Sequence, residues 1–467
     1  MTLLSQGGHA VSQRVGEFLL KTKLDNIPAE VRQIAKLHLL DGLATMIGGA
    51  NEAPAMLLRR HYRAMHGKAE ACVLGTQDRL DAEHAALLNG GQGHVLDYDD
   101  AQLATLPSRP MGQQTHPTSP VLAAALALAE SRRLSGAALL TSYIVGVEVA
   151  CRIGDAVDPS HYLNGFHPTG TLGIFGAAAA SAHLLGLGQS SIRSALGIAG
   201  TMSAGLRANR GTMAKGLNAG RAAQNGVLAA QLAAQGFTAS ENIFDDPMGF
   251  FAAACKNQVE RKLLDFGRPF FFADPGVAIK LYPCAGVLHP ALDLLLQLRE
   301  RHALVPENMQ SICITLDKHA ARPLVYDRPK NGLESKFSLP FAAAVALIDG
   351  AAGLKQFTSA RQRDQKLQNL MNRVRLVRRT PRGKHFGIET HVEITTRRGV
   401  TLGGRDSVAR GDPSRPASRA DIEDKFRQCA GEILPSKQIA KFLQNFWGLE
   451  QTPSTAAWLR QLRPPRR

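Results

Sequence analysis

The amino-acid sequence predicts a mainly α protein, in which both ends of the chain form a large helical domain and a smaller α+β domain lies between them. Most of the first 260 residues are rich in Ala, Gly and Leu or repeat apolar side chains at helical spacing. Alternation with a period of two, which is typical of strands, occurs between residues 271 and 404. Helical patterns return after a linker. We therefore divide the chain into residues 1–270, 271–404 and 405–467.

Several segments of the first part predict helices by their spacing and composition. Residues 28–47 predict an amphipathic helix, because Pro28 suits a first helical turn and Gly48-Gly49 ends the apolar repeat. Small side chains allow helix axes to approach closely, so Ala- and Gly-rich segments predict a compact helical core. Such segments are 119–134, 172–188 and 220–237.

The α+β domain is predicted from two alternating segments. "SICITL" (311–316) and "HVEITT" (391–396) place apolar residues on one face, which indicates strands. The linker 405–418 then precedes Ser418 and Asp421, which have the spacing of a capping box at the start of a further helix.

Composition limits the classes of function. The 467 residues carry a formal net charge of +16 with 44% hydrophobic residues, which favours a globular protein with anionic partners. No secretory leader or long apolar run is evident, so we expect a cytoplasmic protein without membrane partners. The six cysteines form no C-x-x-C pair, which argues against zinc and iron–sulfur sites. Basic stretches at 372–384 and 460–467 contain few aromatics; they fit a solvated face or substrate steering better than a nucleic-acid groove.

The stretch "GHVLDYDDA" (93–101) raises the question of a metal site. If it is helical, Asp97 shares a face with His94 while Asp99 points away, so the three acids do not converge on one ion. The D-x-D-D spacing also resembles the proton-donating motif of some terpene cyclases, but 6% aromatic residues are few for sheltering carbocations. Both alternatives are therefore disfavoured.

Histidines and lysines stand beside Gly or Pro at the edges of several apolar helices. A histidine can move a proton near neutral pH, and lysines and helix N-termini can hold carboxylates and developing negative charge. We find no G-x-S-x-G elbow, P-loop or dinucleotide-binding glycine motif. The residues of this set are His116, His167, Lys215, Lys280 and His289.

Six ordered motifs resemble the MmgE/PrpD family over nearly the whole chain. They are "NGGQGHVLDYDDA", "THPTSPV", "GFHPTGTLGIFGAAAA", "MAKGLNAGRAAQNG", "KLYPCAGVLHP" and "YDRPKNGLESKFSLP". The resemblance implies a helical domain from both chain ends, an α+β lid, a homodimer, and catalysis without a metal or organic cofactor. The reactions it implies are 2-methylcitrate dehydration, cis-aconitate decarboxylation and iminodisuccinate epimerisation.

The resemblance also implies roles for individual residues. The family's active-site aspartate and two histidines match Asp97, His116 and His167, and its two lysines match Lys215 and Lys280. A lid tyrosine matches Tyr326 less closely, because "VYDRP" is one residue shorter than the decarboxylase pattern, and His289 falls on a further family histidine. We expect the histidines to act as general acid and base, the lysines to clamp carboxylates, and Asp97 to orient a histidine.

Two departures from the family pattern bear on the substrate. Ala101 stands where threonine follows the Asp-Asp pair, and the stretch before Thr115 is longer. We predict a lyase or isomerase acting beside a carboxylate of a small polycarboxylate, with dehydration ranked before decarboxylation and epimerisation. The alternative from another class is a catalytically inactive basic scaffold protein.

Overall fold

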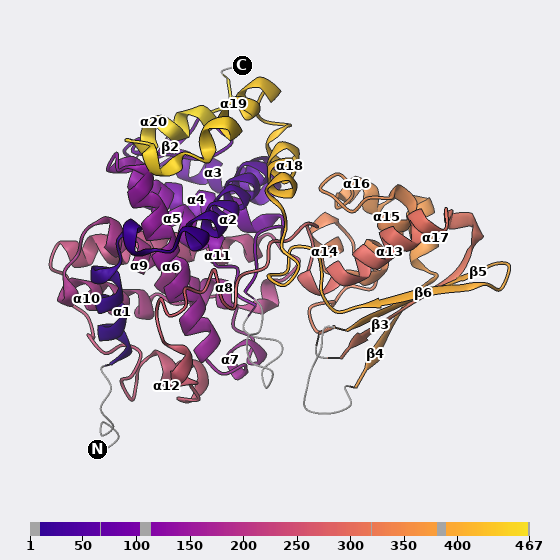
Figure 1. Cartoon of the computed structure of the whole chain (residues 1–467), viewed down its shortest axis with the longest axis horizontal. Helices are drawn as coiled ribbons and strands as arrows, with labels where there is room; N and C mark the ends of the chain where they lie inside the picture. The colour runs from indigo at the N-terminus through magenta and orange to yellow at the C-terminus, as the bar shows by residue number, and fades with distance from the viewer. Residues whose placement is uncertain (1–9, 66, 103–113, 319, 381–388, 466–467) are drawn as a thin grey trace.

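The computed structural model describes residues 10–65, 67–102, 114–318, 320–380 and 389–465, and it is mainly α (Figure 1). The N-terminal helices and the C-terminal helices lie in one body, and the segment between them forms a separate α+β lobe at its side. The predicted fold class is confirmed. We call residues 282–406 the α+β lobe and the remainder the helical body.

The centre of the helical body is a layer of long helices with small residues at their contacts. A Cβ on Gly220 would stand 2.4 Å from the Leu87 carbonyl oxygen, so only glycine permits this approach between α4 and α11. The closeness confirms the packing that the Ala- and Gly-rich segments predict. The central helices are α2 (Ala29–Gly48), α4 (Ala82–Val95), α5 (Thr118–Ser131), α6 (Gly136–Ala156), α9 (Gly173–Leu184) and α11 (Ala214–Ala234).

Shorter elements surround this layer. The helices are α1 (Val11–Lys21), α3 (Ala53–Arg63), α7 (Ser160–Leu163), α8 (Pro168–Thr171), α10 (Gln189–Thr201) and α12 (Phe250–Cys255). The body is not purely helical, because β1 (Ala71–Cys72) and β2 (Arg79–Leu80) form a small antiparallel pair. The 3₁₀ turns of the helical body are Leu24–Asn26, Gly49–Asn51, Arg207–Asn209, Arg261–Leu263, Leu449–Gln451 and Arg460–Leu462, and those of the α+β lobe are Gly286–Leu288 and Pro306–Asn308.

The C-terminal helices complete the helical body. They are α18 (Arg419–Ala430), α19 (Ser436–Phe446) and α20 (Thr455–Leu459). The predicted capping box is confirmed, since the Ser418 side chain accepts from the Asp421 N–H and the Asp421 carboxylate accepts from the Ser418 N–H. Helix α18 packs against α2, so residues almost 400 positions apart share one core.

The α+β lobe has its own apolar core beneath a four-stranded sheet. The strand order is β4-β3-β5-β6, with β3 parallel to β4 and antiparallel to β5. Both predicted strands are confirmed, and Ile312, Ile314 and Leu316 are buried. The elements are α13 (His289–Arg301), β3 (Met309–Asp317), α14 (Gly332–Ser335), α15 (Leu339–Asp349), α16 (Ser359–Gln362), α17 (Gln365–Met371), β4 (Val374–Arg379), β5 (Thr390–Thr396) and β6 (Thr401–Asp406).

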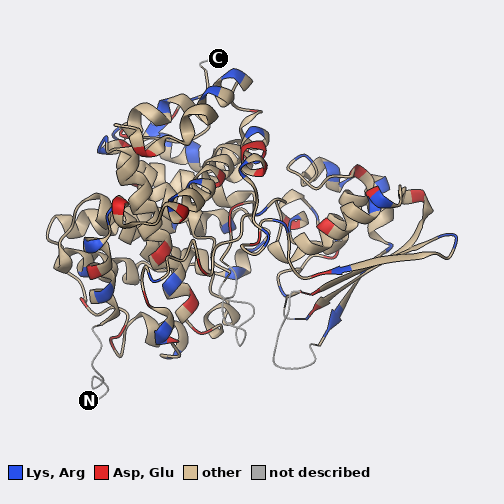
Figure 2. Ribbon diagram, in the orientation of Figure 1, with Lys and Arg blue, Asp and Glu red and all other residues tan. Residues whose placement is uncertain are grey.

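Lys, Arg, Asp and Glu residues are distributed over many elements of both parts of the chain (Figure 2). The basic run predicted as a solvated face falls partly on β4, an edge strand whose Arg375, Arg378 and Arg379 are exposed. Charged side chains on an edge strand discourage pairing with another chain. Residues 381–384 of that run lie outside the described residues.

Two helices differ from their simplest sequence interpretation. Helix α6 is long and apolar enough to cross a membrane, but 89% of its apolar window is buried inside the protein, so it is a core helix. Helix α2 is not amphipathic along its full length, because from Ala35 to Ile47 nearly every residue is buried. The reason is that α4, α5 and α18 all contact it.

Helix α2 therefore carries a charged residue inside the core. Asp41 is buried and pairs with the buried ammonium of Lys425 on α18. Burial raises the pKa of Asp41 to about 6, against the lowering effect of Lys425. The lysine also donates 2.7 Å hydrogen bonds to the carbonyls of Tyr98 and Lys280.

We expect Lys425→Met to destabilise the protein by about 3 to 5 kcal/mol, because it leaves Asp41 buried without a partner. The loss should be larger at pH 8 than at pH 5, since below pH 6 Asp41 can take up a proton instead of keeping an unpaired charge. Urea unfolding at both pH values measures the change in the free energy of unfolding. Lys441→Met on the exposed face of α19 is the control. A loss of equal size at both pH values would show that the ion pair is not its source.

Candidate active site

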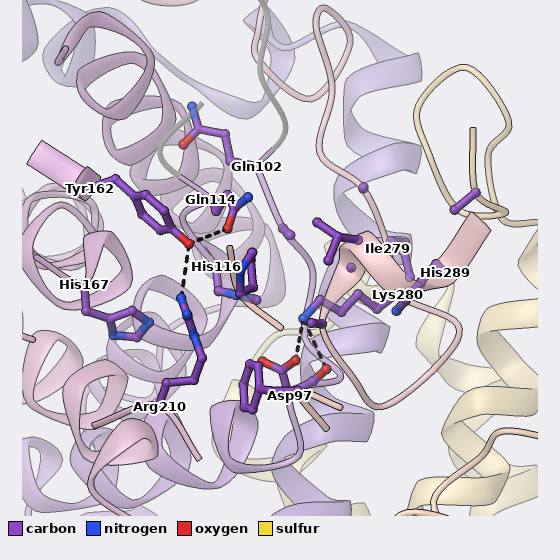
Figure 3. Close-up of a pocket in the computed structure, with 18 of the residues that line it drawn as sticks. Asp97, Gln102, Gln114, His116, Tyr162, His167, Arg210, Ile279, Lys280 and His289 are labelled. Carbon is purple, nitrogen blue, oxygen red and sulfur yellow. Dashed lines mark hydrogen bonds and ion pairs between the residues drawn. The ribbon is translucent and has the colours of Figure 1, made fainter. Parts of the chain in front are cut away.

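A cavity lies between the helical body and the α+β lobe. The helical body contributes residues that follow α4 and precede α5, α8 and α11, and the lobe contributes residues before and at the start of α13. Six of the seven predicted site residues line it: Asp97, His116, His167, Lys215, Lys280 and His289. Figure 3 shows most of these side chains converging on one space.

The loop after α4 does not continue the helix that "GHVLDYDDA" suggests. Helix α4 ends at Val95, and Asp97 has a φ of 51°, a left-handed conformation that costs a non-glycine residue free energy. Helical geometry therefore gave a wrong placement for the acids of this stretch. The loop is held by contacts with distant segments, which no local pattern contains.

Three lysine ammonium groups hold three consecutive carbonyls of this loop. Lys336 Nζ donates to the Leu96 carbonyl at 2.8 Å, and Lys280 Nζ donates to the Asp97 carbonyl at 3.2 Å. Lys425 Nζ donates to the Tyr98 carbonyl at 2.7 Å. Hydrogen bonds from charged donors are stronger than neutral ones, which explains how the strained conformation persists.

The Asp97 carboxylate lies between two lysines. Lys215 Nζ donates to Oδ1 at 2.6 Å, and Lys280 Nζ lies 3.3 Å from Oδ2. Burial by itself raises the pKa of Asp97, but the two ammonium groups outweigh it and hold that pKa well below its usual range. Burial lowers the pKa of Lys215, against the effect of Asp97. The trio keeps one positive charge in excess at this side of the cavity.

The carboxylate that contacts the histidines is Asp99, not Asp97. Asp99 Oδ2 is 2.8 Å from His94 Nδ1 and accepts from Ser119 Oγ at 2.7 Å, while Oδ1 is 3.4 Å from His116 Nδ1. Burial raises the pKa of Asp99, but His94 and His116 outweigh it and keep the pKa well below its usual range. Asp99 thus fixes two imidazole rings, and its expected orientation away from the site was wrong because the helix ends at Val95.

The three imidazoles form a contiguous group in which His116 meets His94 edge-on and His167 is tilted against His94. The ring of His94 is 4.7 Å from that of His116 and 5.3 Å from that of His167. Burial lowers the pKa of His94 to about 4 and that of His167 well below its usual range, with neighbouring cations adding to the effect. Asn218 Nδ2 is 3.0 Å from His167 Nδ1, so that nitrogen accepts and the ring proton of neutral His167 is on Nε2.

Asp100 and Ala101 complete the stretch. Asp100 Oδ2 is 2.9 Å from His38 Nδ1 and accepts from Thr118 Oγ1 at 2.5 Å, so this acid supports the start of α5 behind the cavity. Ala101 lines the cavity and pairs through its backbone with Ala278, which also lines it. Its methyl group leaves space where the family pattern has a hydroxyl.

Two predicted residues have more distant positions. His289 lines the cavity but its Nε2 faces the Cys284 carbonyl at 3.3 Å, and burial lowers its pKa to about 3. Tyr326 is not among the lining residues; its hydroxyl donates to the Arg210 carbonyl at 2.9 Å. The structure thus brings Tyr326 next to a residue of the cavity wall rather than into the cavity.

Sequence reasoning missed several polar residues of the cavity. They are Gln102, Gln114, Tyr162, Arg207, Arg210, Asn218, Ser407, Arg410 and Asp412. The signal available for Arg207 and Arg210 was "GLRANRG", a basic pair between two glycines just before the Lys215 motif. Both glycines have positive φ, 149° at Gly205 and 76° at Gly211. No such signal marks Tyr162 or Gln114.

One group among the described residues has the side chains and closeness of a metal site: His94, Asp99 and His116, whose ligand atoms lie within 4.8 Å of one another. The atoms a metal would use already serve hydrogen bonds, because Asp99 Oδ2 accepts from Ser119 and contacts His94 Nδ1. This donor set fits an orienting carboxylate better than a metal centre. Metal independence stays a prediction.

Lysines, arginines and neutral imidazoles lie on the wall of this buried cavity. Such groups suit an enzyme that binds an anionic substrate and transfers protons to or from it. Comparison with known families agrees with this. The model of the MmgE/PrpD N-terminal domain matches residues 13–262, and that of the MmgE/PrpD C-terminal domain matches residues 282–449. The chain belongs to the MmgE/PrpD family, and it is an enzyme of the lyase or decarboxylase type.

Individual relatives are named as decarboxylases. The cis-aconitate decarboxylase of Homo sapiens is 27% identical over 462 residues, covering 95% of this chain and 93% of that protein. The cis-aconitate decarboxylase of Aspergillus terreus is 28% identical over 354 residues, covering 72% and 71%. A cis-aconitate decarboxylase-like protein of Aspergillus oryzae is 25% identical over 478 residues, covering 96% of each chain.

We expect Asp99→Asn to lower kcat by about 10²-fold with a small change in KM, because it removes the charge that favours an imidazolium and frees the rings of His94 and His116. The pH profile should change with it, since a merely structural role would leave its shape intact. Steady-state kinetics across pH measures both. Ser119→Ala, which removes one donor to the same carboxylate but no charge, should have a much smaller effect. Equal effects of the two substitutions would contradict the role of Asp99.

Proposed function

We propose that this enzyme is a lyase for a small tricarboxylate and that its reaction is decarboxylation of cis-aconitate or a close analogue. The names of the relatives support decarboxylation, which we therefore rank before the dehydration that the motifs suggested. The single observation that carries the proposal is the cavity wall, where a lysine pair stands beside an imidazole group that Asp99 orients.

The charge of the wall suits a polyanion. Arg207, Arg210, Lys215, Lys280 and Arg410 line the cavity, and of the lining residues only Asp97 and Asp412 are acids. Arg410 is already paired with Asp421 on α18. The excess of positive charge compensates the cost of taking carboxylates out of water.

The chemistry begins with loss of carbon dioxide from the saturated arm of the substrate. The electron pair of the broken carbon–carbon bond spreads over the adjacent double bond, toward a carboxylate that the lysine pair can stabilise. A proton delivered to the far carbon of the former double bond then completes the product. The enzyme must therefore hold carboxylates and supply one proton, and it needs no electron donor.

His116 is the proposed proton donor. Among the three imidazoles, His116 both lies beside Asp99 and lines the cavity, so its protonated form has a carboxylate partner and its ring borders the substrate space. His167 lines the same cavity with a depressed pKa, so it is neutral and suits a hydrogen-bonding or base role.

The neutral state of His167 favours a second candidate, dehydration or epimerisation, in which a base removes a proton beside a carboxylate. These reactions pass through related carbanions, so the same residues serve each of them. The alternative from another class, a catalytically inactive basic scaffold protein, is disfavoured, because the chain is an enzyme of the MmgE/PrpD family. As for partners, we propose a homodimer in the cytoplasm that uses neither nucleic acid nor membrane.

The reaction is tested by incubating the enzyme with cis-aconitate, 2-methylcitrate and iminodisuccinate in D₂O and following each by NMR. We expect cis-aconitate to lose carbon dioxide and to gain one deuterium at the protonated carbon. Turnover of another substrate instead would replace decarboxylation by that reaction. Absence of both turnover and deuterium exchange with all three would contradict the proposed substrate class.

The roles of the histidines are tested by His116→Gln and His167→Gln. If His116 donates the proton, its replacement should lower kcat by about 10² or more with little change in KM. Replacement of His167 should lower decarboxylation less, because the step from cis-aconitate needs no base. Undiminished kcat in the His116 variant would overturn the assignment, and thermal melts of both variants show whether the fold is intact.

A further inference from the structure

Arg210 brings a guanidinium to the cavity wall without an acidic partner. Every Asp and Glu of the chain belongs to the described residues, since the undescribed stretches contain neither. Among those described residues, no carboxylate forms an ion pair with Arg210. A half-buried guanidinium that faces a cavity without a counter-ion is a receptor for an anion, because its planar fork matches a carboxylate.

The contacts of Arg210 fix the position of its side chain but use only one of its guanidinium nitrogens. Nη2 is 3.1 Å from the Tyr162 hydroxyl, which in turn donates to Gln114 Oε1 at 2.9 Å (Figure 3). Within the described chain, its Nε and Nη1 make no hydrogen bond. The side chain is therefore anchored at one nitrogen and open at the others.

The backbone of Arg210 is fixed from the α+β lobe. The Tyr326 hydroxyl donates to the Arg210 carbonyl at 2.9 Å. Gly211 follows with a φ of 76°, and a Cβ there would stand 2.6 Å from that hydroxyl oxygen. Glycine at 211 thus permits both the turn and the close approach of Tyr326, so the receptor is assembled only where the two parts of the chain meet.

The other cations of the wall are already engaged. Lys215 and Lys280 contact Asp97. The neighbouring Arg207 lies 3.5 Å over the Tyr162 ring and donates to the Tyr162 carbonyl, so it supports that tyrosine. Arg210 is the cation of this group with neither a carboxylate nor a carbonyl acceptor in the described chain.

We propose that Arg210 binds a carboxylate of the substrate that the lysine pair does not reach, and so selects tricarboxylates over dicarboxylates. This inference rests on the proposed function for its substrate. The ammonium of Lys215 and the guanidinium of Arg210 are each 5.6 Å from the centre of the Phe337 ring, so they are at most twice that distance apart. Carboxylates on a three-carbon chain are roughly 5 Å apart, and hydrogen bonds of about 2.8 Å at each end span the rest.

The same geometry gives Tyr326 a positioning role. It does not line the cavity, yet its hydroxyl holds the carbonyl of the residue that binds the carboxylate. The effect of Tyr326 on ligands should therefore pass through Arg210 and should concern only ligands with the third carboxylate.

The test uses binding of two unreactive ligands, measured by calorimetry on the full-length protein: tricarballylate, with three carboxylates, and malonate, whose two carboxylates are too close together to reach both the lysine pair and Arg210. We expect Arg210→Gln to weaken tricarballylate about 10²-fold and malonate less than threefold. Arg210→Lys should restore part of the lost affinity, because lysine has the positive charge of arginine but not its planar guanidinium. Tyr326→Phe should weaken tricarballylate a few-fold and malonate not at all.

The matched control is Arg221→Gln on the exposed face of α11, which makes the same change in net charge away from the cavity. If Arg210→Gln weakens both ligands by the same factor, or weakens neither, the inference is overturned. Thermal melts identify a variant that fails to fold, and the Arg210→Lys variant then carries the comparison.

Kinetics separate this inference from the proposed reaction. With cis-aconitate, Arg210→Gln should raise KM about 10²-fold and change kcat by less than threefold. If the wild-type enzyme turns over no tricarboxylate but the binding difference persists, the proposed function fails and the Arg210 site stands. If turnover is found and the binding difference is absent, the Arg210 site fails and the proposed function stands.

Discussion

The structure of the site depends on the burial of Asp97 between two lysines. A carboxylate and two ammonium groups inside a protein are tolerated only when they meet one another with good geometry, and these three come from the ends of segments far apart in the chain. The carbonyls of the same loop are held by Lys336, Lys280 and Lys425. The α+β lobe, the segment before it and the C-terminal helix α18 are thereby fastened to one short turn after α4.

These lysine contacts with the loop after α4 also explain the arrangement of the histidines around Asp99. Because α4 ends at Val95, Asp99 turns back toward His94 and contacts His116 as well. The acids of one short stretch then have three different tasks. Asp97 balances the lysines, Asp99 orients imidazoles, and Asp100 supports the start of α5. These three acids are near neighbours in sequence, but their side chains face in different directions and contact different residues.

The cavity wall is built from both parts of the chain. His116, His167 and Lys215 belong to the helical body, whereas Val287, His289 and Phe337 come from the α+β lobe. In the proposed reaction His116 supplies the proton and Arg210 binds a substrate carboxylate. Ala101 lies only two positions after Asp99, so one short stretch both orients the histidines and lines the cavity.

The sequence by itself determined the fold class, both strands of the lobe core, the capping box at Ser418 and six residues of the cavity, because helical period, strand alternation and ordered motifs are local properties of the chain. It did not determine where α4 ends, which acid contacts the histidines, or that Arg210 faces the cavity. Those features follow from buried lysines and a tyrosine that come from segments more than a hundred residues away. Only the tertiary structure brings these segments together. A buried charge is stable where it meets a partner, and here the partner is far away in the sequence.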